Sequence, residues 1–423
     1  MSEEGKILAG LDLCEEEAQL TWYDEKKREP ESLNASGETV GEQEDCLIPA
    51  VLAVKPESGE WLFGQDALRA GDGAVKIDGL LRRIREGEAY ERDGMSFSPE
   101  FLLERFLRKV LTILTNRFPG KRIAALAVTL KEADPVPVTA VYRVLQALGL
   151  GRDRAVVQSH SQSFVHYTLN QPKDIWMNDV GLFELDRQGL MYYQLGINRR
   201  MVPMTVMVNK EDLSGTFGYD LIEDKLPVEQ LDYIFDNLAR SVLHKKIVST
   251  LYITGKGFDG TWADETLKGL CVGRRVFKGR NLYAKGACYT AKELLEEEKP
   301  DYLVLDEEML PATVKVRLYS DARMLDCVLV QAGTPWYEAE SRITIILDDT
   351  DEIDFVVSNP MKKESIHQVM TLDGFYKREN KTCRLALSIR FLDRITAVVT
   401  VRDLGFGDFY PSGHRIWEQI LIL

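Results

Sequence analysis

Two acidic side chains near the ends of strand-like runs are the first candidates for chemistry. Asp12 lies at the end of the apolar run 7–13, and Glu184 lies near the end of the run 180–185. Two carboxylates could hold a hydrated Mg²⁺ ion, because Mg²⁺ is bound through one or two carboxylates and keeps several of its waters. The alternative is that both residues end hairpin strands and face solvent.

Three further residues could face an anion. Gly255 and Gly257 follow the strand-like run 248–254, and glycines allow backbone N–H groups to converge on a negative charge. Arg187, in the predicted hairpin turn 186–189, could replace such backbone donors. The alternatives are a strand-to-helix turn that needs glycine for its own geometry, and an arginine in an exposed hairpin.

Length and composition are those of a soluble globular protein with two or three domains. The 423 residues are 45% hydrophobic and 28% charged, which suffices for sizeable cores. A net charge of −14 argues against nucleic acid as the main partner. No run approaches the ~18 apolar residues of a membrane span, and the acidic residues 1–6 lack an apolar signal core. We therefore expect a cytoplasmic protein without membrane contact.

Neither the cysteines nor the histidines show the spacing of a metal site. The cysteines are Cys14, Cys46, Cys271, Cys288, Cys327 and Cys383, and the histidines are His160, His166, His244, His367 and His414. Without a C-x-x-C pair, we expect isolated reduced thiols rather than metal ligands. No nucleophile elbow surrounds the Ser161 next to His160.

The order of predicted elements occurs twice. From residue 6 to about 170, three strands lead into a helix, then strand, helix, strand and helix, and the same order recurs from residue 179 to about 295. Ser98 and Pro99 supply an N-cap and a first-turn proline for the first long helix. The duplicated order resembles the α/β actin-like ATPase architecture of two RNase H-like lobes, which encloses a nucleotide. The lobes would span about 1–172 and 173–299.

Beyond the second lobe the pattern changes to strands alone. The acidic, Pro300-containing stretch favours an interdomain linker at 300–306, and the alternative is an edge strand of the next domain. The runs 313–318, 342–347 and 384–391 are strand-like, and loops rich in Asp, Asn, Pro and Gly separate the strands. This pattern is typical of a β-sandwich, which we expect over 307–423.

Short motifs in order along the chain resemble the seventy-kilodalton heat-shock chaperone family. They are residues 10–13 (Gly-Leu-Asp-Leu), 48–51 (Ile-Pro-Ala-Val), 63–67 (Phe-Gly-Gln-Asp-Ala), 156–161 through 167–169, 253–257, 302–306 and 402–407. Nearly the whole chain is covered, and the order and spacing carry the resemblance more than any single motif. The resemblance implies an ATPase domain followed by a peptide-binding β-domain, with Asp12, Glu184, Arg187, Gly255 and Gly257 as the residues that could contact ATP or ADP and Mg²⁺.

The phosphate-binding parts depart from that family. Where the family has G-T-T, residues 14–17 read Cys-Glu-Glu-Glu, which places three carboxylates where a triphosphate would lie. The second loop, 184–189, keeps one glycine, and the family's water-positioning glutamate falls on Ser159. The family's phosphate-contacting lysine has no clear match, with Lys76 as a weak candidate.

We also expect two larger parts of the family to be absent. Only about 35 residues separate the hairpin at Gly189 from the helix at Pro227, where the family has a subdomain that covers the adenine. No helical lid follows the β-domain before Leu423.

Three functions remain open on this basis. The favoured one is a chaperone-like or scaffold protein with a degenerate ATPase domain, weak or absent nucleotide binding, and a lidless β-domain that binds a protein or peptide. The alternatives are an active ATPase with unorthodox phosphate contacts and a structural, self-assembling actin-like protein.

Overall fold

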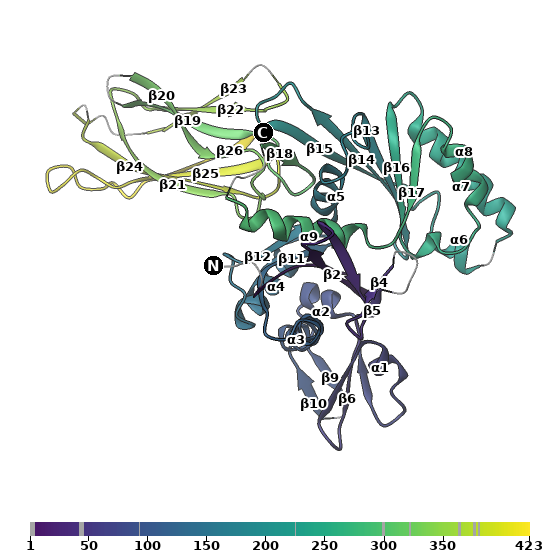
Figure 1. Cartoon of the computed structure of the whole chain (residues 1–423). Coiled ribbons are helices and arrows are strands. Elements are labelled where there is room, and N and C mark those ends of the chain that lie inside the picture. Colours follow the sequence, from purple (N-terminus) through teal and green to yellow (C-terminus); the bar gives the residue numbers. More distant parts are fainter. Residues whose placement is uncertain are drawn as a thin grey trace. The chain divides into compact units, whose positions relative to one another are not determined.

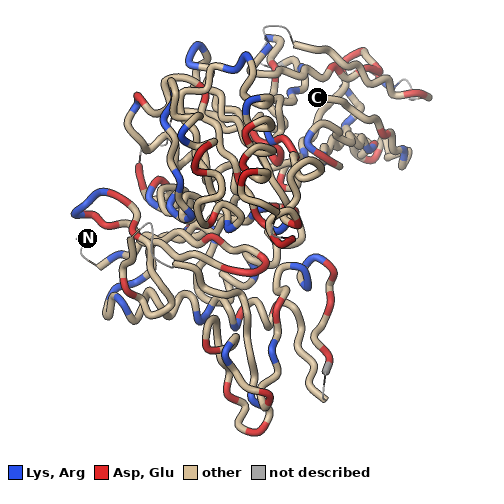
Figure 2. The backbone as a smooth tube through the Cα atoms, turned by 90° about the vertical axis from the view of Figure 1, so that its right-hand side faces the viewer, with Lys and Arg blue, Asp and Glu red and all other residues tan. Residues whose placement is uncertain are grey.

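The chain divides into two compact units, which are Met1–Ile197 with Val208–Pro300 and Asn198–Met207 with Asp301–Leu423. The computed structural model describes residues 5–41, 46–92, 94–224, 226–297, 301–320, 323–362, 365–374, 378–379 and 381–423. Lys and Arg alternate with Asp and Glu along much of the backbone (Figure 2). In these described ranges, no helix has the length and apolar character needed to cross a membrane.

The first sheet follows the order β12-β11-β1-β2-β3-β4, and β5 pairs with β2 (Figure 1). Its strands are β1 (Lys6–Leu13), β2 (Glu17–Asp24), β3 (Glu29–Leu33), β4 (Thr39–Val40), β5 (Leu47–Pro49), β11 (Arg122–Leu130) and β12 (Ala155–Ser159). Strands β1, β11 and β12 are parallel, and β2 and β3 continue the sheet antiparallel. The nearly unbroken apolar run of β11 fits this central position, because a parallel strand is buried on both faces.

Three longer helices belong to this half, and the first begins at the predicted cap. They are α3 (Pro99–Arg117), α4 (Pro135–Ala147) and α5 (His160–Leu169). Ser98 caps α3 by accepting a hydrogen bond from the backbone N–H of Phe101. Ser159 caps α5 through a reciprocal capping box with Gln162.

A smaller inserted part lies between β5 and α3. It consists of β6 (Leu52–Lys55), β7 (Glu60–Phe63), α1 (Gly64–Arg69), β8 (Val75–Ile77), α2 (Leu80–Glu86), β9 (Tyr90–Arg92) and β10 (Met95–Phe97). Strands β6 and β7 form an antiparallel pair around the turn 56–59.

The second sheet repeats the strand order of the first. Its strands β13 (Asp179–Asp186), β14 (Gly189–Asn198), β15 (Met204–Asp212), β16 (Val248–Thr254) and β17 (Arg275–Lys278) follow the order β17-β16-β13-β14-β15. Its helices are α6 (Asp220–Glu223), α7 (Val228–Leu243) and α8 (Asp264–Leu270). When the short strands β4 and β5 of the first sheet and the strand 302–305 at the edge of the second are left out, the chain order of neighbouring strands in both sheets is fifth, fourth, first, second, third.

Helix α9 (Leu282–Leu295) differs from the expectation that it completes the second half. Its small residues Ala287 and Ala291 pack on Ala125 and Ala127 of β11, in the first sheet. The close approach extends to Gly10 of β1, where an added Cβ would lie 2.3 Å from the carbonyl oxygen of Ala284. Because α9 joins the first sheet, its N-terminal end reaches the strand ends that form the candidate site.

The second unit contains two four-stranded sheets. One has the order β20-β19-β22-β23 and the other β21-β24-β25-β26. Their strands are β19 (Thr313–Ser320), β20 (Arg323–Val330), β21 (Glu340–Leu347), β22 (Glu352–Ser358), β23 (Ser365–Thr371), β24 (Cys383–Phe391), β25 (Thr396–Asp403) and β26 (Ile416–Ile422). One core formed from both sheets includes Val316, Phe355, Leu387 and Val399.

The expected linker at 300–306 is corrected in part. Residues Tyr302–Leu305 form strand β18, which pairs in parallel with residues 204–207 of β15. These residues are thus an edge strand, but one of the second sheet, where β18 follows β15 in the strand order. Neither a linker nor an edge strand of the following β-domain describes them. Pro300 lies outside the described residues.

Candidate functional site

Three parallel strands of the first sheet bring polar residues to one edge. Asp12 of β1 is in register with Thr129 of β11, which is in register with Gln158 of β12. Lys131 and His160 follow directly after β11 and β12. Since the carboxyl ends of parallel strands meet at the same sheet edge, residues far apart in sequence become neighbours there.

His160 lies between two buried carboxylates. Its Nε2 is 2.8 Å from Oδ1 of Asp12, and its Nδ1 is 3.7 Å from Oε1 of Glu184. Its ring stacks on Tyr283 with the centroids 3.7 Å apart. Burial lowers the pKa of His160, but Asp12 and Glu184 outweigh this effect and raise the pKa to about 9. At neutral pH the metal-free site therefore holds an imidazolium between the two carboxylates.

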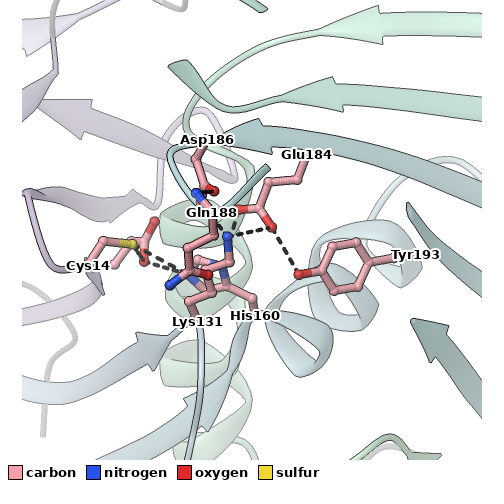
Figure 3. Close-up of polar contacts among 8 residues, drawn as sticks. Cys14, Lys131, His160, Glu184, Asp186, Gln188 and Tyr193 are labelled. Atoms are coloured by element: carbon pink, nitrogen blue, oxygen red, sulfur yellow. Dashed lines mark hydrogen bonds and ion pairs between the residues drawn. The ribbon is translucent and has the colours of Figure 1, made fainter. Parts of the chain in front are cut away.

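Glu184 is held from two sides (Figure 3). The hydroxyl of Tyr193 donates a hydrogen bond of 2.9 Å to its Oε2, and Nζ of Lys131 lies 3.8 Å from the same oxygen. Lys131 also pairs with Asp186. Burial raises the pKa of Glu184, but Lys131, His160 and Tyr193 together lower it to about 2. Glu184 is thus a fixed anion.

Cys14 completes a group of three different donor atoms. Its Sγ lies 3.5 Å from Oδ1 of Asp12 and 3.8 Å from Nε2 of His160. The three donor atoms all lie within 4.8 Å of one another. Burial and the nearby carboxylates of Asp12 and Glu184 hold the pKa of the Cys14 thiol well above its usual range, so Cys14 is a neutral thiol in the metal-free site.

These side chains line a cavity of about 260 Å³. At its border, Nε of Arg187 lies 2.7 Å from Oε1 of Glu16, and Nη1 of Arg85 lies 2.7 Å from Oε1 of Glu15. Burial raises the pKa of Glu17, a further lining residue, to about 7. The cavity therefore contains both signs of charge, and several of its cations are paired with the protein's own acids.

Four of the five predicted site residues lie together at this cavity. Asp12, Glu184, Arg187 and Gly255 all line this cavity. Gly257 is buried, is not among the lining residues, and would place a Cβ 2.3 Å from the Leu185 side chain.

The alternatives have different outcomes. Asp12 and Glu184 are each 4% exposed, so the expectation that they face solvent is wrong. The Arg187 side chain is 63% exposed, which agrees with an arginine in an exposed hairpin, although it also lines the cavity. Gly255 has φ +95° and would place a Cβ 2.3 Å from the carbonyl oxygen of Leu185, so its turn needs glycine for its own geometry.

The weak candidate Lys76 lies elsewhere. Its Nζ donates a hydrogen bond to the carbonyl oxygen of Leu68, and it is not among the lining residues. Lys131 is the lysine next to Glu184. The sequence reasoning missed Lys131, Cys14 and His160, although all three follow predicted strands that would end at one sheet edge.

These residues do not fit Mg²⁺ with a triphosphate. His160 lies between Asp12 and Glu184, where the hydrated ion was expected. The backbone N–H of Cys14 donates to the carbonyl oxygen of Glu17, and that of Gln188 donates to Asp186, so neither is free for a phosphate. Glu15 and Glu16 add negative charge where a triphosphate would have to lie.

Two family models match the chain. The model described as the C-terminal part of a family of unknown function (DUF5716) matches residues 32–307, and that of a domain of unknown function (DUF8552) matches residues 309–423. None of the curated proteins matches the sequence. Because the first match covers more than half of the 423 residues, the chain belongs to the family of unknown function DUF5716.

Proposed function

We propose that the chain is a chaperone-like or scaffold protein with an actin-like first unit that does not hydrolyse ATP and a second unit that binds a protein or peptide. The shared strand order of the two sheets supports the actin-like architecture. Parallel pairing of β1 with β11 and of β13 with β16 supports it further, as does antiparallel pairing of β1 with β2 and of β13 with β14.

The position of His160 carries the non-hydrolysing part of the proposal. Phosphoryl transfer depends on positioned donors, bound metal and an oriented nucleophile. Here the imidazole contacts Asp12 and Glu184, and Lys131 contacts Glu184 and Asp186. The carboxylates that would bind Mg²⁺ and the lysine that would contact the triphosphate are therefore already paired with each other or with the imidazole.

Phosphate release from Mg-ATP tests this part. The full chain is expected to release phosphate no faster than a matched blank, and its melting temperature is expected to be insensitive to Mg-ATP and Mg-ADP. A release rate that disappears in Asp12→Ala would overturn the proposal in favour of an active ATPase. A thermal shift without release would keep the protein non-hydrolysing but make the nucleotide a ligand.

Exposed apolar side chains in the second unit support partner binding there. Phe409 is 94% exposed, and Ile416, Ile420 and Ile422 are exposed along β26, which ends its sheet. An extended peptide can add to such an edge through main-chain hydrogen bonds and place its side chains on exposed apolar groups. The net charge of −14 favours a basic segment, and binding at an exposed sheet edge is expected to exchange quickly.

Titration of the full chain with a basic-apolar peptide tests the second part. We expect weak, fast-exchanging binding that ATP does not change, that an acidic scrambled peptide lacks, and that Phe409→Ala weakens. Tyr319→Ala is the matched control, since Tyr319 is 63% exposed on β19. Equal responses to both peptides would sink this part. Sedimentation that increases with concentration would instead favour a self-assembling protein.

A further inference from the structure

We propose that Asp12, Cys14 and His160 form a binding site for one transition-metal ion of the Zn²⁺ type. This inference goes beyond the proposed function and does not depend on it. The three residues come from the end of β1, the turn after it and the start of α5, and each lines the same cavity. Nothing in the spacing of the cysteines and histidines along the chain indicates this site, because the fold assembles it.

The separations of the donor atoms suit a small tetrahedral ion. With Zn–S of about 2.3 Å and Zn–N or Zn–O of about 2.0–2.1 Å, tetrahedral ligand atoms lie roughly 3.3–3.6 Å apart. The Cys14 Sγ lies 3.5 Å from Oδ1 of Asp12 and 3.8 Å from Nε2 of His160. The third separation, between Asp12 and His160, is a hydrogen bond of 2.8 Å that has to open by roughly half an ångström.

The donor types select the class of metal. A thiolate and an imidazole favour Zn²⁺ and similar ions, whereas Mg²⁺ prefers oxygen ligands. Three protein ligands with a fourth position open to a cavity is the arrangement of metal sites that bind water or a substrate. The cavity of about 260 Å³ provides space for that fourth ligand.

The surroundings of His160 provide an independent observation. A metal-bound histidine almost always donates its other ring N–H to a carboxylate, a backbone carbonyl or water. Nδ1 of His160 is buried, has no hydrogen-bond partner among the residues that the structure describes, and faces Oε1 of Glu184 at 3.7 Å. Tyr193 holds that carboxylate and Tyr283 stacks on the imidazole, so both groups are already oriented. A small shift of the ring toward Glu184 would make this hydrogen bond and open the contact with Asp12.

Titration of the chelator-treated full chain with Co²⁺ and then Zn²⁺ tests the proposal. We expect one Co²⁺ per chain, a thiolate-to-cobalt charge-transfer band in the near ultraviolet, and loss of the band when Zn²⁺ is added. Cys14→Ser should abolish the band and weaken Zn²⁺ binding at least tenfold. Cys271→Ser, at an exposed cysteine, should change neither. A band that survives in Cys14→Ser, or no band in the wild type, would overturn the proposal.

Two further measurements guard against loss of folding. Glu184→Gln should keep the thiolate band but weaken Zn²⁺ binding by roughly 10–100-fold, as expected for a residue that orients a ligand. X-ray absorption of the Zn-loaded wild type needs no variant. One sulfur at about 2.3 Å with nitrogen or oxygen neighbours at about 2.0 Å is expected, and a shell without sulfur would reject the site.

Discussion

His160 and Asp12, 148 residues apart in the sequence, form a buried pair with Nε2 and Oδ1 2.8 Å from each other. The pair connects the start of α5 to the end of β1 in the middle of the cavity. Neither side chain is more than 5% exposed, so water contributes little to stabilising the charges. The pair therefore contributes to folding and decides what else the cavity can hold.

Asp12→Asn should destabilise the metal-free protein strongly. Removing one partner of a buried ion pair typically costs about 3–5 kcal/mol, and here the buried imidazolium would lose its nearer carboxylate and keep Glu184 at 3.7 Å. The free energy of unfolding from urea denaturation measures the effect. Glu60→Gln is the control, since Glu60 pairs with Lys55 at an exposed position and should change stability by less than about 1 kcal/mol. Similar losses in the two variants would show that the pair does not stabilise the fold.

The sequence predicts the elements better than their assembly. Helix α3 is specified by local signals, which are its capping residue Ser98 and its apolar face. The turns of the hairpins are local signals as well. These elements therefore form as predicted. The packing of α9 on β11 and the pairing of β18 with β15 join distant segments. No local propensity specifies such contacts, which is why the expected place of α9 in the second half and the expected linker at 300–306 needed correction.

The candidate site was predicted only in part for the same reason. Asp12 and Glu184 are recognisable because each lies in a motif that resembles a phosphate loop of the chaperone family. The contact of both with His160 follows from the ends of β1 and β12 lying at one sheet edge, which requires the strand pairing to be known. Periodicity and spacing do not contain that information.

Glu17→Gln should stabilise the protein at high pH and have little effect at low pH. Burial raises the pKa of Glu17 from 4.5 to about 7, against a lowering effect of Lys256. A group with a raised folded-state pKa contributes stability that is complete below 4.5 and is lost as the pH rises through about 7. The glutamine cannot ionise, so the free energy of unfolding should increase by an amount on the order of 2 kcal/mol at pH 8 and change little at pH 4. Urea denaturation at both pH values measures this difference, and a gain equal at both would contradict it.

Gly286→Ala should destabilise the packing of α5 on α9. An added Cβ would lie 2.0 Å from the backbone carbonyl oxygen of Ser163, which cannot move away without shifting α5. Overpacking of this kind typically costs about 1–3 kcal/mol or more. The matched control is Gly269→Ala in α8, where the nearest atom is the guanidinium of Arg240 at 3.4 Å. The Gly269→Ala variant should have an unchanged free energy of unfolding or one that is higher by up to about 1 kcal/mol. Thermal denaturation that ranks the two in the opposite order would refute the close helix packing.

Asp403→Ala should loosen the turn after β25 in the second unit. Asp403 is buried, accepts hydrogen bonds from the backbone N–H groups of Gly405 and Gly413, and pairs with both terminal nitrogens of Arg378. Burial raises the pKa of Asp403, but Arg378 and these N–H groups outweigh it and lower the pKa. Its stabilising effect is therefore present above the ordinary carboxylate pKa and is lost as the pH falls through the lowered value.

The variant is expected to unfold at a lower urea concentration at pH 7. The expected loss of unfolding free energy is about 3 kcal/mol, because two N–H groups lose their acceptor and Arg378 loses its carboxylate partner while it keeps the carbonyl oxygen of Pro411. Asp348→Ala is the control, since Asp348 pairs with Lys381 at an exposed position over 3.5 Å. Hydrogen exchange should show faster exchange at Gly405 and Gly413 in Asp403→Ala alone. Unchanged exchange at both amides would mean that the turn holds its shape without this carboxylate.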